Sequence, residues 1–335
     1  GTFMGGLAAL ARAAGHRVTG CDAGVYPPMS DQLRALGIDL IEGYSADQLA
    51  LKPDLFVIGN VVSRARLADG SPKFPLMEAI LDSGAAYTSG PQWLSEHILQ
   101  GRHVLAVAGT HGKTTTTSML AWILECAGQE PGFLVGGVPL NFGVSARLGA
   151  ARRPQPGAGP KGEAPLFVIE ADEYDTAFFD KRSKFVHYRP RTAVLNNLEF
   201  DHADIFRDVA DVQRTFLHLT RIVPRNGWIV INGDDANLKA LGPLAWTRVA
   251  RVGLEEGNDL RLAGFRESAD GALFRLVWQG KPWADVKWAQ SGIFNARNAA
   301  MAALAAGLAL FPDDPTRLRL DGLAKFRGVK RRQEL

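Results

Sequence analysis

The fold is decided by one stretch of the chain, which reads Val104-Leu105-Ala106-Val107-Ala108-Gly109-Thr110-His111-Gly112-Lys113-Thr114-Thr115-Thr116-Thr117. Its first part is wholly apolar, as in a buried strand of a parallel sheet. The glycine turn that follows directs backbone N–H groups at one point, where the next helix adds the positive end of its dipole. This order predicts a site for a phosphate chain, with Lys113 at the β- and γ-phosphates and the Thr114 hydroxyl on Mg²⁺.

The turn departs from the usual phosphate-loop pattern. That pattern has a glycine five residues before Gly112, where this chain has Val107, and the glycine lies at position 109 instead. The loop is therefore the shorter G-x-x-G-K-T form. A chance glycine turn before a helix is the alternative, and the order of strand, turn, Lys-Thr and helix argues against it. For His111, a position beside the phosphate and a plain loop role remain equally open.

The bulk composition is that of an ordinary globular protein. The 335 residues are 46% hydrophobic and 22% charged, and the length suggests about two domains. The net charge of +3 gives no case for a nucleic-acid partner. The longest apolar run, 299–311, is too short to cross a bilayer, so we expect a buried helix and no membrane contact. Cys21 and Cys126 lack metal-ligand spacing and are expected to be free thiols in the cytoplasm.

Strand and helix signals alternate through the first hundred residues, a pattern typical of a doubly wound α/β domain. Helices are expected over 5–14, 30–36 and 74–83, and strands over 18–21, 38–41 and 55–58. A second domain is expected to hold strands at 104–108, 166–170, 192–196, 228–231, 273–279 and 283–288 and a helix at 296–310. The stretch 152–165, rich in Pro, Gly and Ala, predicts a flexible surface insertion.

A glycine turn also opens the chain, with the sequence Gly1-Thr2-Phe3-Met4-Gly5-Gly6. A nucleotide-binding turn should follow a strand, yet no strand precedes Gly1, so we expect the chain to begin inside its first motif. This turn and Asp22 suggest a nicotinamide dehydrogenase. That class is disfavoured, because the spacing is not G-x-G-x-x-G and because a separate phosphate loop follows.

Polar residues follow two of the expected strands. The strand 166–170 ends in a group of carboxylates at the edge where α/β sheets bind ligands; they are Glu170, Asp172, Glu173 and Asp175. Carboxylates beside phosphates suit Mg²⁺, and a solvated acidic turn is the alternative. The strand 192–196 leads to His202 among further acids, so a metal or phosphate role competes there with a structural one.

Two asparagines mark the start of the last helix. Asn295 and Asn298 lie three residues apart and share one helix face. For Asn295, helix capping and contact with a nucleobase both remain open.

These motifs resemble the Mur ligase family, which are ATP-dependent enzymes that form amide bonds in peptidoglycan synthesis. The resemblance rests on segments that occur in the order seen in that family, namely 109–115, 170–173, 196–202 and 295–298. The runs 26–30, 89–93 and 178–185 are similar to the branch that joins UDP-N-acetylmuramate to the recovered tripeptide L-Ala-γ-D-Glu-meso-diaminopimelate. The alternative is the branch of de novo synthesis that adds L-alanine. Phe294 departs from the family, whose members usually carry His there, although a Phe ring could stack on adenine.

The resemblance implies a Rossmann-like UDP-sugar domain over 1–100 and a P-loop ATPase domain with a mainly parallel sheet over 101–325. Residues 326–335 resemble the junction to a C-terminal Rossmann-like domain that binds the amine substrate. We expect this domain and the first strand to be missing, and the chain to be a fragment that is inactive in ligation. The resemblance also implies a cytoplasmic monomer whose small-molecule partners are UDP-N-acetylmuramate and the tripeptide.

The resemblance further implies a role for each candidate residue. ATP would form an acyl phosphate on the muramoyl carboxylate, which the tripeptide amine then attacks. The catalytic residues would be Lys113, Glu170 and His202, and Mg²⁺ would be held by Thr114, Glu170 and His202. ATP would contact Gly109, Thr110, His111, Gly112, Lys113, Thr114, Thr115, Asn295, Asn298 and either Arg331 or Arg332. The UDP-sugar would contact the turn Gly1, Thr2, Phe3, Met4, Gly5 and Gly6, together with Asp22 and Asn60.

Two other classes of protein remain open. A P-loop switch or motor would need no UDP-sugar domain, and its hydrolysis would depend on GTP or on a partner. A pure binding protein would keep Lys113 but would need neither Glu170 nor His202.

Overall fold

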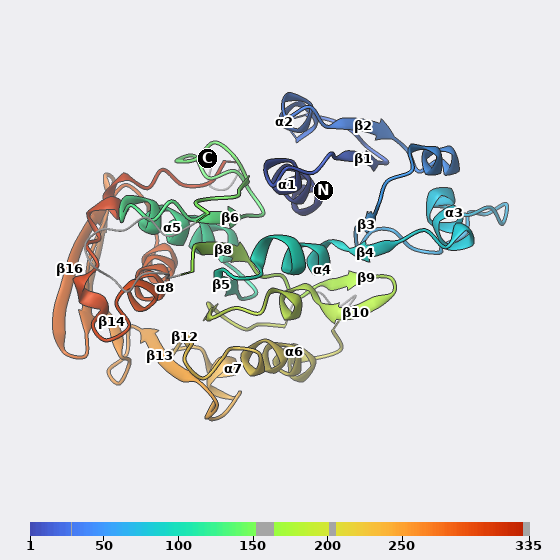
Figure 1. Ribbon diagram of the computed structural model, residues 1–335. Coiled ribbons are helices and arrows are strands. Elements are labelled where there is room, and N and C mark those ends of the chain that lie inside the picture. Colours follow the sequence, from blue (N-terminus) through green and yellow to red (C-terminus); the bar gives the residue numbers. More distant parts are fainter. Residues whose placement is uncertain (28, 152–163, 201–205, 331–335) are drawn as a thin grey trace.

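The computed structural model describes residues 1–27, 29–151, 164–200 and 206–330 (Figure 1). Its dominant element is a ten-stranded sheet with the strand order β16-β15-β14-β13-β12-β11-β5-β8-β6-β7. Neighbouring strands are parallel from β6 to β14 and antiparallel at the two edges, which confirms the predicted mainly parallel sheet. The strands are β5 His103–Ala108, β6 Gly132–Leu134, β7 Ala146–Arg147, β8 Leu166–Glu170, β11 Thr192–Leu195, β12 Trp228–Asn232, β13 Arg248–Gly253, β14 Leu260–Ser268, β15 Gly271–Trp278 and β16 Lys281–Trp288.

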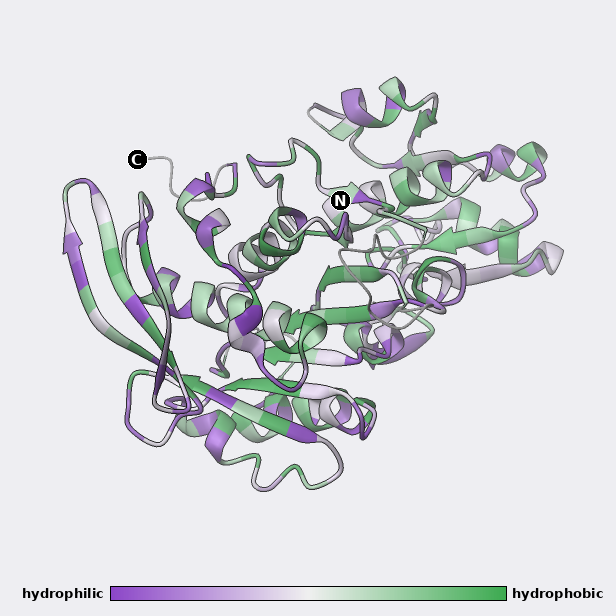
Figure 2. Ribbon diagram, turned by 60° about the vertical axis from the view of Figure 1, so that its left-hand side comes forward, coloured by the Kyte–Doolittle hydropathy of each residue, from purple (hydrophilic) through white to green (hydrophobic). Residues whose placement is uncertain are grey.

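The middle of this sheet is buried on both faces, because helices cover it from both sides (Figure 1). Leu105 and Val107 of β5 belong to one core with α5 Lys113–Cys126 and α8 Ile293–Leu310. The alternate residues of the same strand belong to a second core with α1 Thr2–Ala13 and α6 Val209–Arg221. Hydrophobic strand ribbons accordingly run through the interior in Figure 2.

The strands next to β5 are in a register that brings their carboxyl ends together. Ala108 pairs with Leu195 of β11, and Val107 pairs with Glu170 of β8. The loop after β5 therefore begins beside the ends of both neighbours. This is the edge where the sequence predicts phosphate and metal ligands.

Helix α8 confirms the expected buried helix. By length and composition alone it could cross a membrane, yet 72% of its apolar window lies inside the protein, as in the core helix of a soluble protein. Shorter helices complete the region: α7 Ala236–Lys239, η3 Lys184–Tyr188, η4 Pro315–Arg317 and η5 Asp321–Lys325.

The first hundred residues form smaller units than expected. They contain β1 Thr19–Asp22, β2 Asp39–Glu42, β3 Phe56–Ile58, β4 Tyr87–Ser89, α2 Met29–Ala35, α3 Pro75–Ser83, α4 Gly90–Leu94, η1 Ala46–Leu51 and η2 Ser95–Leu99. The strands pair as two separate parallel ladders, β1 with β2 and β3 with β4. The expected single doubly wound sheet is therefore wrong for the described residues, since none of their strands hydrogen-bonds both pairs.

The glycine turn at the start of the chain is also not a turn. Gly5 and Gly6 are buried inside α1, which begins directly after Gly1. A Cβ at Gly5 would lie 2.5 Å from Met29 Sδ, so the small residue lets α1 approach α2. Gly5 and Gly6 thus serve helix packing, and the predicted contact of this segment with the UDP diphosphate stays a prediction.

A hairpin of the sheet region reaches the first hundred residues. It consists of β9 Asp175–Ala177 and β10 Asp180–Ser183, with Phe178 and Phe179 at its tip. Phe178 packs against the small core around Met77, and the ring of Phe179 lies 5.1 Å from that of Tyr87. The hairpin and α1 thus connect the two parts of the molecule.

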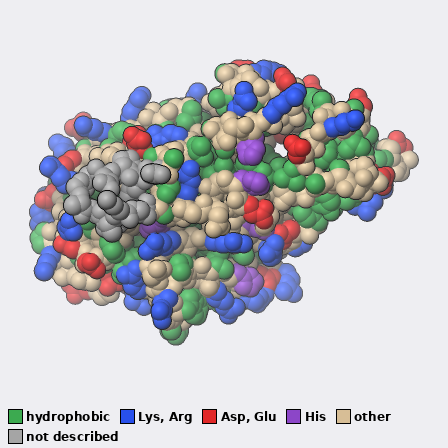
Figure 3. Space-filling model, viewed as in Figure 1, with side chains coloured by type: hydrophobic (Ala, Val, Ile, Leu, Met, Phe, Trp, Pro, Cys, Tyr) green, Lys and Arg blue, Asp and Glu red, His purple; other side chains and the backbone are tan. Residues whose placement is uncertain are grey.

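The surface carries no single field of one charge on the face that Figure 3 shows, where Lys and Arg lie among Asp and Glu. This agrees with the small net charge of +3. Residues 152–163 of the predicted insertion lie outside the described residues.

Candidate active site

The loop between β5 and α5 requires its two glycines. Gly109 has a φ of +147° and Gly112 a φ of +76°, values that residues with a side chain rarely adopt. A Cβ at Gly109 would lie 2.9 Å from Asn196 Cβ, and one at Gly112 would lie 2.9 Å from Asn298 Oδ1. The loop can therefore rest against the end of β11 and against α8 only with glycine at both positions.

The segment after β11 holds this loop in place. The backbone N of Thr110 donates to Asn197 O at 3.2 Å, and the backbone N of His111 donates to Asn197 Oδ1 at 2.8 Å. Glu199 N donates to Thr110 Oγ1 at 2.8 Å. The His111 side chain is 62% exposed, with Nε2 3.7 Å from Glu199 Oε2. Its ring therefore stands at the rim of the loop.

Asn196 ties the loop region to the helices on one face of the sheet. Its Nδ2 donates to Thr116 Oγ1 at 2.7 Å and lies 3.5 Å from Asn298 Oδ1. Asn232 Nδ2 in turn donates to Asn196 O at 2.9 Å. Sequence reasoning used 196–202 for the family resemblance but assigned Asn196 and Asn197 no role. The available signal was two side-chain amides directly after a strand that neighbours the loop strand.

Lys113 is folded back onto its own loop. Its Nζ donates to Gly109 O at 2.6 Å and lies 3.2 Å from Glu173 Oε2, with side chains 10% and 3% exposed. Burial raises the pKa of Glu173, and the charge of Lys113 opposes this rise. A bound γ-phosphate would offer the ammonium the same kind of oxygen acceptors. The phosphate contact of Lys113 stays a prediction.

Glu170 and Thr114 meet where the sequence predicts Mg²⁺. Thr114 Oγ1 donates to Glu170 Oε1 at 2.9 Å, and Gly136 N donates to Glu170 Oε2 at 2.7 Å. Burial, followed by the charge of Asp172, raises the pKa of Glu170. A hydroxyl beside a buried carboxylate fits the oxygen preference of Mg²⁺, and a cation there would offset the buried negative charge.

The described residues contain no preformed cluster of metal ligands at this point. Within the described ranges, no group of three or more His, Cys, Asp or Glu is placed to hold a metal. His202, Arg331 and Arg332 lie outside the described residues, so their metal and phosphate roles stay predictions.

A polar cavity of about 530 Å³ opens beside the loop. It is lined by His111, Gly112, Asn197, Glu199, Asn232, Asp234, Asp235, Phe294, Arg297 and Asn298. Phe294 is 59% exposed, so its ring is free to meet a flat ligand. The cavity thus offers one aromatic ring and several amide and charged groups next to the phosphate loop.

The two candidate asparagines of α8 have different surroundings. Asn298 lines the cavity, whereas Asn295 Nδ2 donates to Ser291 O at 2.7 Å, just before the helix. The N-cap of α8 is Gly292, with no side-chain cap hydrogen bond, so the capping interpretation of Asn295 is wrong. Its contact with a nucleobase stays a prediction. Thr115 lies half-buried in the first turn of α5.

The candidates for the UDP-sugar are spread over the first hundred residues. Thr2, Phe3 and Met4 are half-buried at the start of α1. Asp22 ends β1, where its Oδ1 accepts a hydrogen bond from Tyr44 Oη at 3.2 Å. Asn60 is exposed after β3. Their contacts with a UDP-sugar stay predictions.

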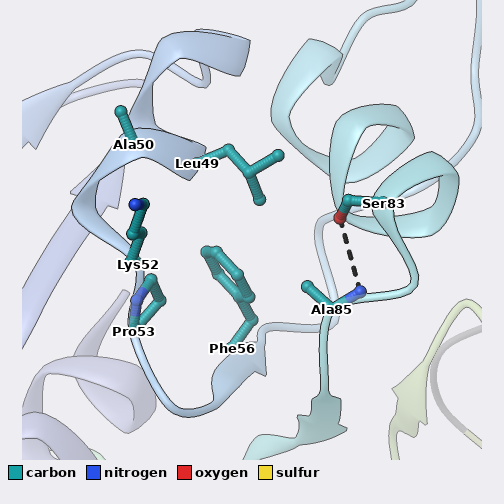
Figure 4. Close-up of a pocket in the computed structure, with 7 residues that line it drawn as sticks. All are labelled: Leu49, Ala50, Lys52, Pro53, Phe56, Ser83 and Ala85. Carbon is teal, nitrogen blue, oxygen red and sulfur yellow. Dashed lines mark hydrogen bonds between the residues drawn. The ribbon is translucent and has the colours of Figure 1, made fainter.

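A second hollow, of about 400 Å³, lies in the same part of the chain (Figure 4). The side chains of Leu49 and Phe56 point into it, beside Ala85. Its other lining residues are Ala50, Lys52, Pro53 and Ser83. It holds one charged group and no acid–base pair, so it offers no chemistry comparable to that of the loop.

Profiles of two Mur ligase domains match the chain. The Mur ligase family catalytic domain matches residues 1–102, and the Mur ligase middle domain matches residues 107–306. A curated Escherichia coli K12 relative, named UDP-N-acetylmuramate–L-alanyl-γ-D-glutamyl-meso-2,6-diaminoheptandioate ligase, is 49% identical over 339 residues. A Haemophilus influenzae relative of the same name is 44% identical over 341 residues. The alignments cover 100% of this chain and 67% and 68% of those proteins.

Solved structures agree with these relatives. The UDP-N-acetylmuramate:L-alanyl-γ-D-glutamyl-meso-diaminopimelate ligase of Neisseria meningitides superposes with a TM-score of 0.85 at 53% identity, over 99% of this chain and 97% of that chain. A UDP-N-acetylmuramate-alanine ligase of Thermotoga maritima superposes with a TM-score of 0.73 at 22% identity, over 98% of this chain and 67% of that chain. At that identity the second likeness supports the fold alone.

Proposed function

The chain belongs to the Mur ligase family, and we propose that it serves the ATP-dependent joining of UDP-N-acetylmuramate to L-alanyl-γ-D-glutamyl-meso-diaminopimelate. The observation that carries this proposal is the 49% identity to the E. coli ligase of that name, which extends over the whole chain. The alternative that adds L-alanine has the weaker support, since the structural relative with that activity is 22% identical.

The geometry of the loop fits the first step of such a reaction. A muramoyl carboxylate oxygen attacks the γ-phosphorus of ATP, an O–P bond forms, and the bond to ADP breaks. In this proposal the N-terminus of α5, which begins at Lys113, and the Lys113 ammonium would bind the γ-phosphate. Mg²⁺, held by Thr114 and Glu170, would neutralise phosphate charge. In the second step the tripeptide amine attacks the acyl carbon and phosphate leaves.

The cavity beside the loop is the proposed place of the nucleoside. Asn298 lines it directly behind Gly112, and the exposed ring of Phe294 provides a stacking surface for adenine. The family resemblance implies His at that position, and both side chains present a flat face. The base would therefore lie between α8 and the segment after β11.

We propose that the enzyme works in the cytoplasm. Cys21 and Cys126 are free, which suits a reducing compartment. The monomeric state stays a prediction, as do the division into domains at 100 and 325 and the second metal ligand His202.

The part of the relatives without a counterpart here bears on the second step. The chain spans 67% and 68% of the length of the two curated relatives. We propose that the unmatched third supplies the amine site, as the family resemblance implies. These 335 residues alone should then bind Mg-ATP and UDP-N-acetylmuramate yet form no UDP-muramoyl tripeptide.

The test compares this chain with a fusion to the unmatched part of the E. coli relative. Both proteins receive ATP, Mg²⁺, UDP-N-acetylmuramate and the tripeptide, and mass spectrometry detects the product. We expect product from the fusion and none when tripeptide is replaced by L-alanine. Product from L-alanine alone would favour the alternative ligase, and ligation by the unfused chain would contradict the role given to the unmatched part.

A further inference from the structure

Lys184 is a buried lysine between the two parts of the molecule. It begins η3, and its side chain is 9% exposed. Its backbone N donates to Tyr174 O at 2.9 Å, which fixes the start of the side chain. Its Nζ lies 5.2 Å from the centre of the Phe3 ring and 5.7 Å from that of the Tyr174 ring. The ammonium therefore stands against α1, the helix that carries the predicted UDP-sugar contacts.

The described residues provide the Lys184 ammonium with few hydrogen-bond acceptors. Among the described residues its nearest carboxylate oxygen is Asp172 Oδ2 at 3.8 Å, and it donates no hydrogen bond to any of them. An ammonium carries three donors, and burying a charge is costly unless it is paired and hydrogen-bonded. The aromatic faces of Phe3 and Tyr174 offset only part of this cost, because a cation–π contact provides no hydrogen-bond acceptor. The site is thus suited to an added anionic oxygen.

The position of Lys184 relative to Lys113 indicates which anion this is. Asp172 and Glu173 are neighbours directly after β8, and each lies beside one lysine, Asp172 beside Lys184 and Glu173 beside Lys113. Two ammonium groups therefore flank the same strand end. Lys113 belongs to the nucleotide loop, and Lys184 faces the side where α1 lies.

We propose that Lys184 binds the muramoyl carboxylate of the UDP-sugar and holds it toward the γ-phosphate, an assignment that rests on the proposed function. The carboxylate oxygen must touch the γ-phosphorus to react, so it has to lie between the nucleotide loop and the UDP-sugar site. Lys184 occupies this junction. A cation there brings two negatively charged reactants together at a position with little water, where its charge acts strongly. Lys184 would then be a substrate-binding residue that also sets specificity for a carboxylate-bearing sugar.

The competing explanation is that Lys184 only connects α1 to η3 through its cation–π contacts. A structural connection of this kind would affect every UDP-sugar equally. Binding of the muramoyl carboxylate would affect only ligands that carry that group. The diphosphate is the other anion of the substrate, and it is shared by UDP-N-acetylmuramate and UDP-N-acetylglucosamine.

The test measures the affinity of the 335-residue chain for these two UDP-sugars by calorimetry, in the wild type and in Lys184→Met. The matched control is Lys181→Met, an exposed lysine of the same run that pairs with Asp175. We expect Lys184→Met to weaken UDP-N-acetylmuramate about tenfold or more, as for loss of a hydrogen bond to a charged group. UDP-N-acetylglucosamine and Mg-ATP should bind as before, and Lys184→Arg should keep most of the preference.

Each other outcome overturns the assignment in a recognisable way. Equally weakened binding of both UDP-sugars would indicate that Lys184 contacts the diphosphate or has a structural role. Unchanged binding of both UDP-sugars would exclude a substrate contact. Retained Mg-ATP binding identifies a folded variant. A wild-type chain that binds neither sugar would contradict the proposed function together with this inference, whereas a wild type that binds both alike would contradict the inference alone.

Discussion

The region built on the ten-stranded sheet and the first hundred residues both combine parallel strands with helices. They differ in the length of their strands and in how deeply those strands are buried. β5, β8 and β11 are almost wholly buried, and the two cores beside them extend through the sheet region. In the first hundred residues the strands have three or four residues and are mostly half-exposed. Their own core consists of Ile58, Phe74, Leu76, Met77 and Ile80.

This difference indicates where each part derives its stability. The phosphate loop belongs to a frame that many buried contacts hold rigid, as a site for charge stabilisation requires. The first hundred residues depend on their neighbour, since Leu7 and Leu10 of α1 belong to the core of the sheet region. We therefore expect the two parts to respond differently to equivalent changes.

The largest effect should come from truncation in the sheet core. Leu105→Ala empties a fully buried position in β5 and should cost about 4 kcal/mol of the free energy of unfolding. Leu76→Ala in the small core, where the side chain is 7% exposed, should cost about 2 kcal/mol. Denaturant unfolding measures the stability of both variants, and separate binding measurements give their affinities for Mg-ATP and for the UDP-sugar. Leu76→Ala should lower the affinity for the UDP-sugar and leave the affinity for Mg-ATP unchanged. Equal effects on both affinities would contradict the contrast between the two regions.

The next effect concerns the loop lysine. Because Lys113 and Glu173 are both buried, Lys113→Ala should cost about 3 kcal/mol of stability in addition to removing Mg-ATP binding. The loss should depend on pH. Burial raises the pKa of Glu173 and Lys113 opposes this, so the variant raises it further. A carboxyl with a raised folded pKa adds stability below its unfolded pKa and loses it as pH rises through the folded pKa.

The deficit of Lys113→Ala should therefore be smaller at pH 5 than at pH 8. Denaturant unfolding of the apo protein at both pH values measures it. The control is Lys113→Ala with Glu173→Gln. In this variant the part of the pH dependence that comes from Glu173 should disappear, while Mg-ATP binding stays lost. A deficit that is the same at both pH values would show that Glu173 is not its source.

The sequence predicted the sheet region better than the first hundred residues for a physical reason. Apolar runs such as 104–108 and 166–170 are typical of strands that a parallel sheet buries on both faces. The glycine turn after the first run is typical of a loop that binds phosphate. The pairing of Lys113 with Glu173, and of Lys184 with Asp172, depends on which strand ends meet and has no local signal. The turn predicted at Gly5 is a helix instead, because a glycine that permits helix packing and one that forms a turn look alike in sequence.

The packing of Gly5 against Met29 leads to a third test. Gly5→Ala should force Met29 to move and should cost about 2 kcal/mol, as for an overpacked core position. If packing is the cause, the double variant Gly5→Ala, Met29→Ala should recover part of the loss, because the second change opens the space. Thermal unfolding and UDP-sugar affinity are measured for both variants. Weakened UDP-sugar binding that the second change does not restore would favour the original interpretation of Gly5 as a substrate contact.

The smallest expected effect lies at the rim of the rigid region. Phe294 is 59% exposed and lines the cavity beside Gly112, so its removal should leave stability nearly unchanged. If its ring stacks on adenine, Phe294→Ala should weaken Mg-ATP by about 1 kcal/mol, or about fivefold. Phe294→His introduces the residue that the family resemblance implies here and should bind Mg-ATP within about twofold of the wild type, since both rings offer a flat face. The matched control is Phe200→Ala, an aromatic side chain of similar exposure (47%) that does not line the cavity.

Calorimetry with Mg-ATP and Mg-GTP separates stacking from base recognition, because loss of stacking weakens the binding of both nucleotides alike. Selective weakening of Mg-ATP would instead indicate that Phe294 shapes the pocket for adenine, and no change in either would place the base elsewhere.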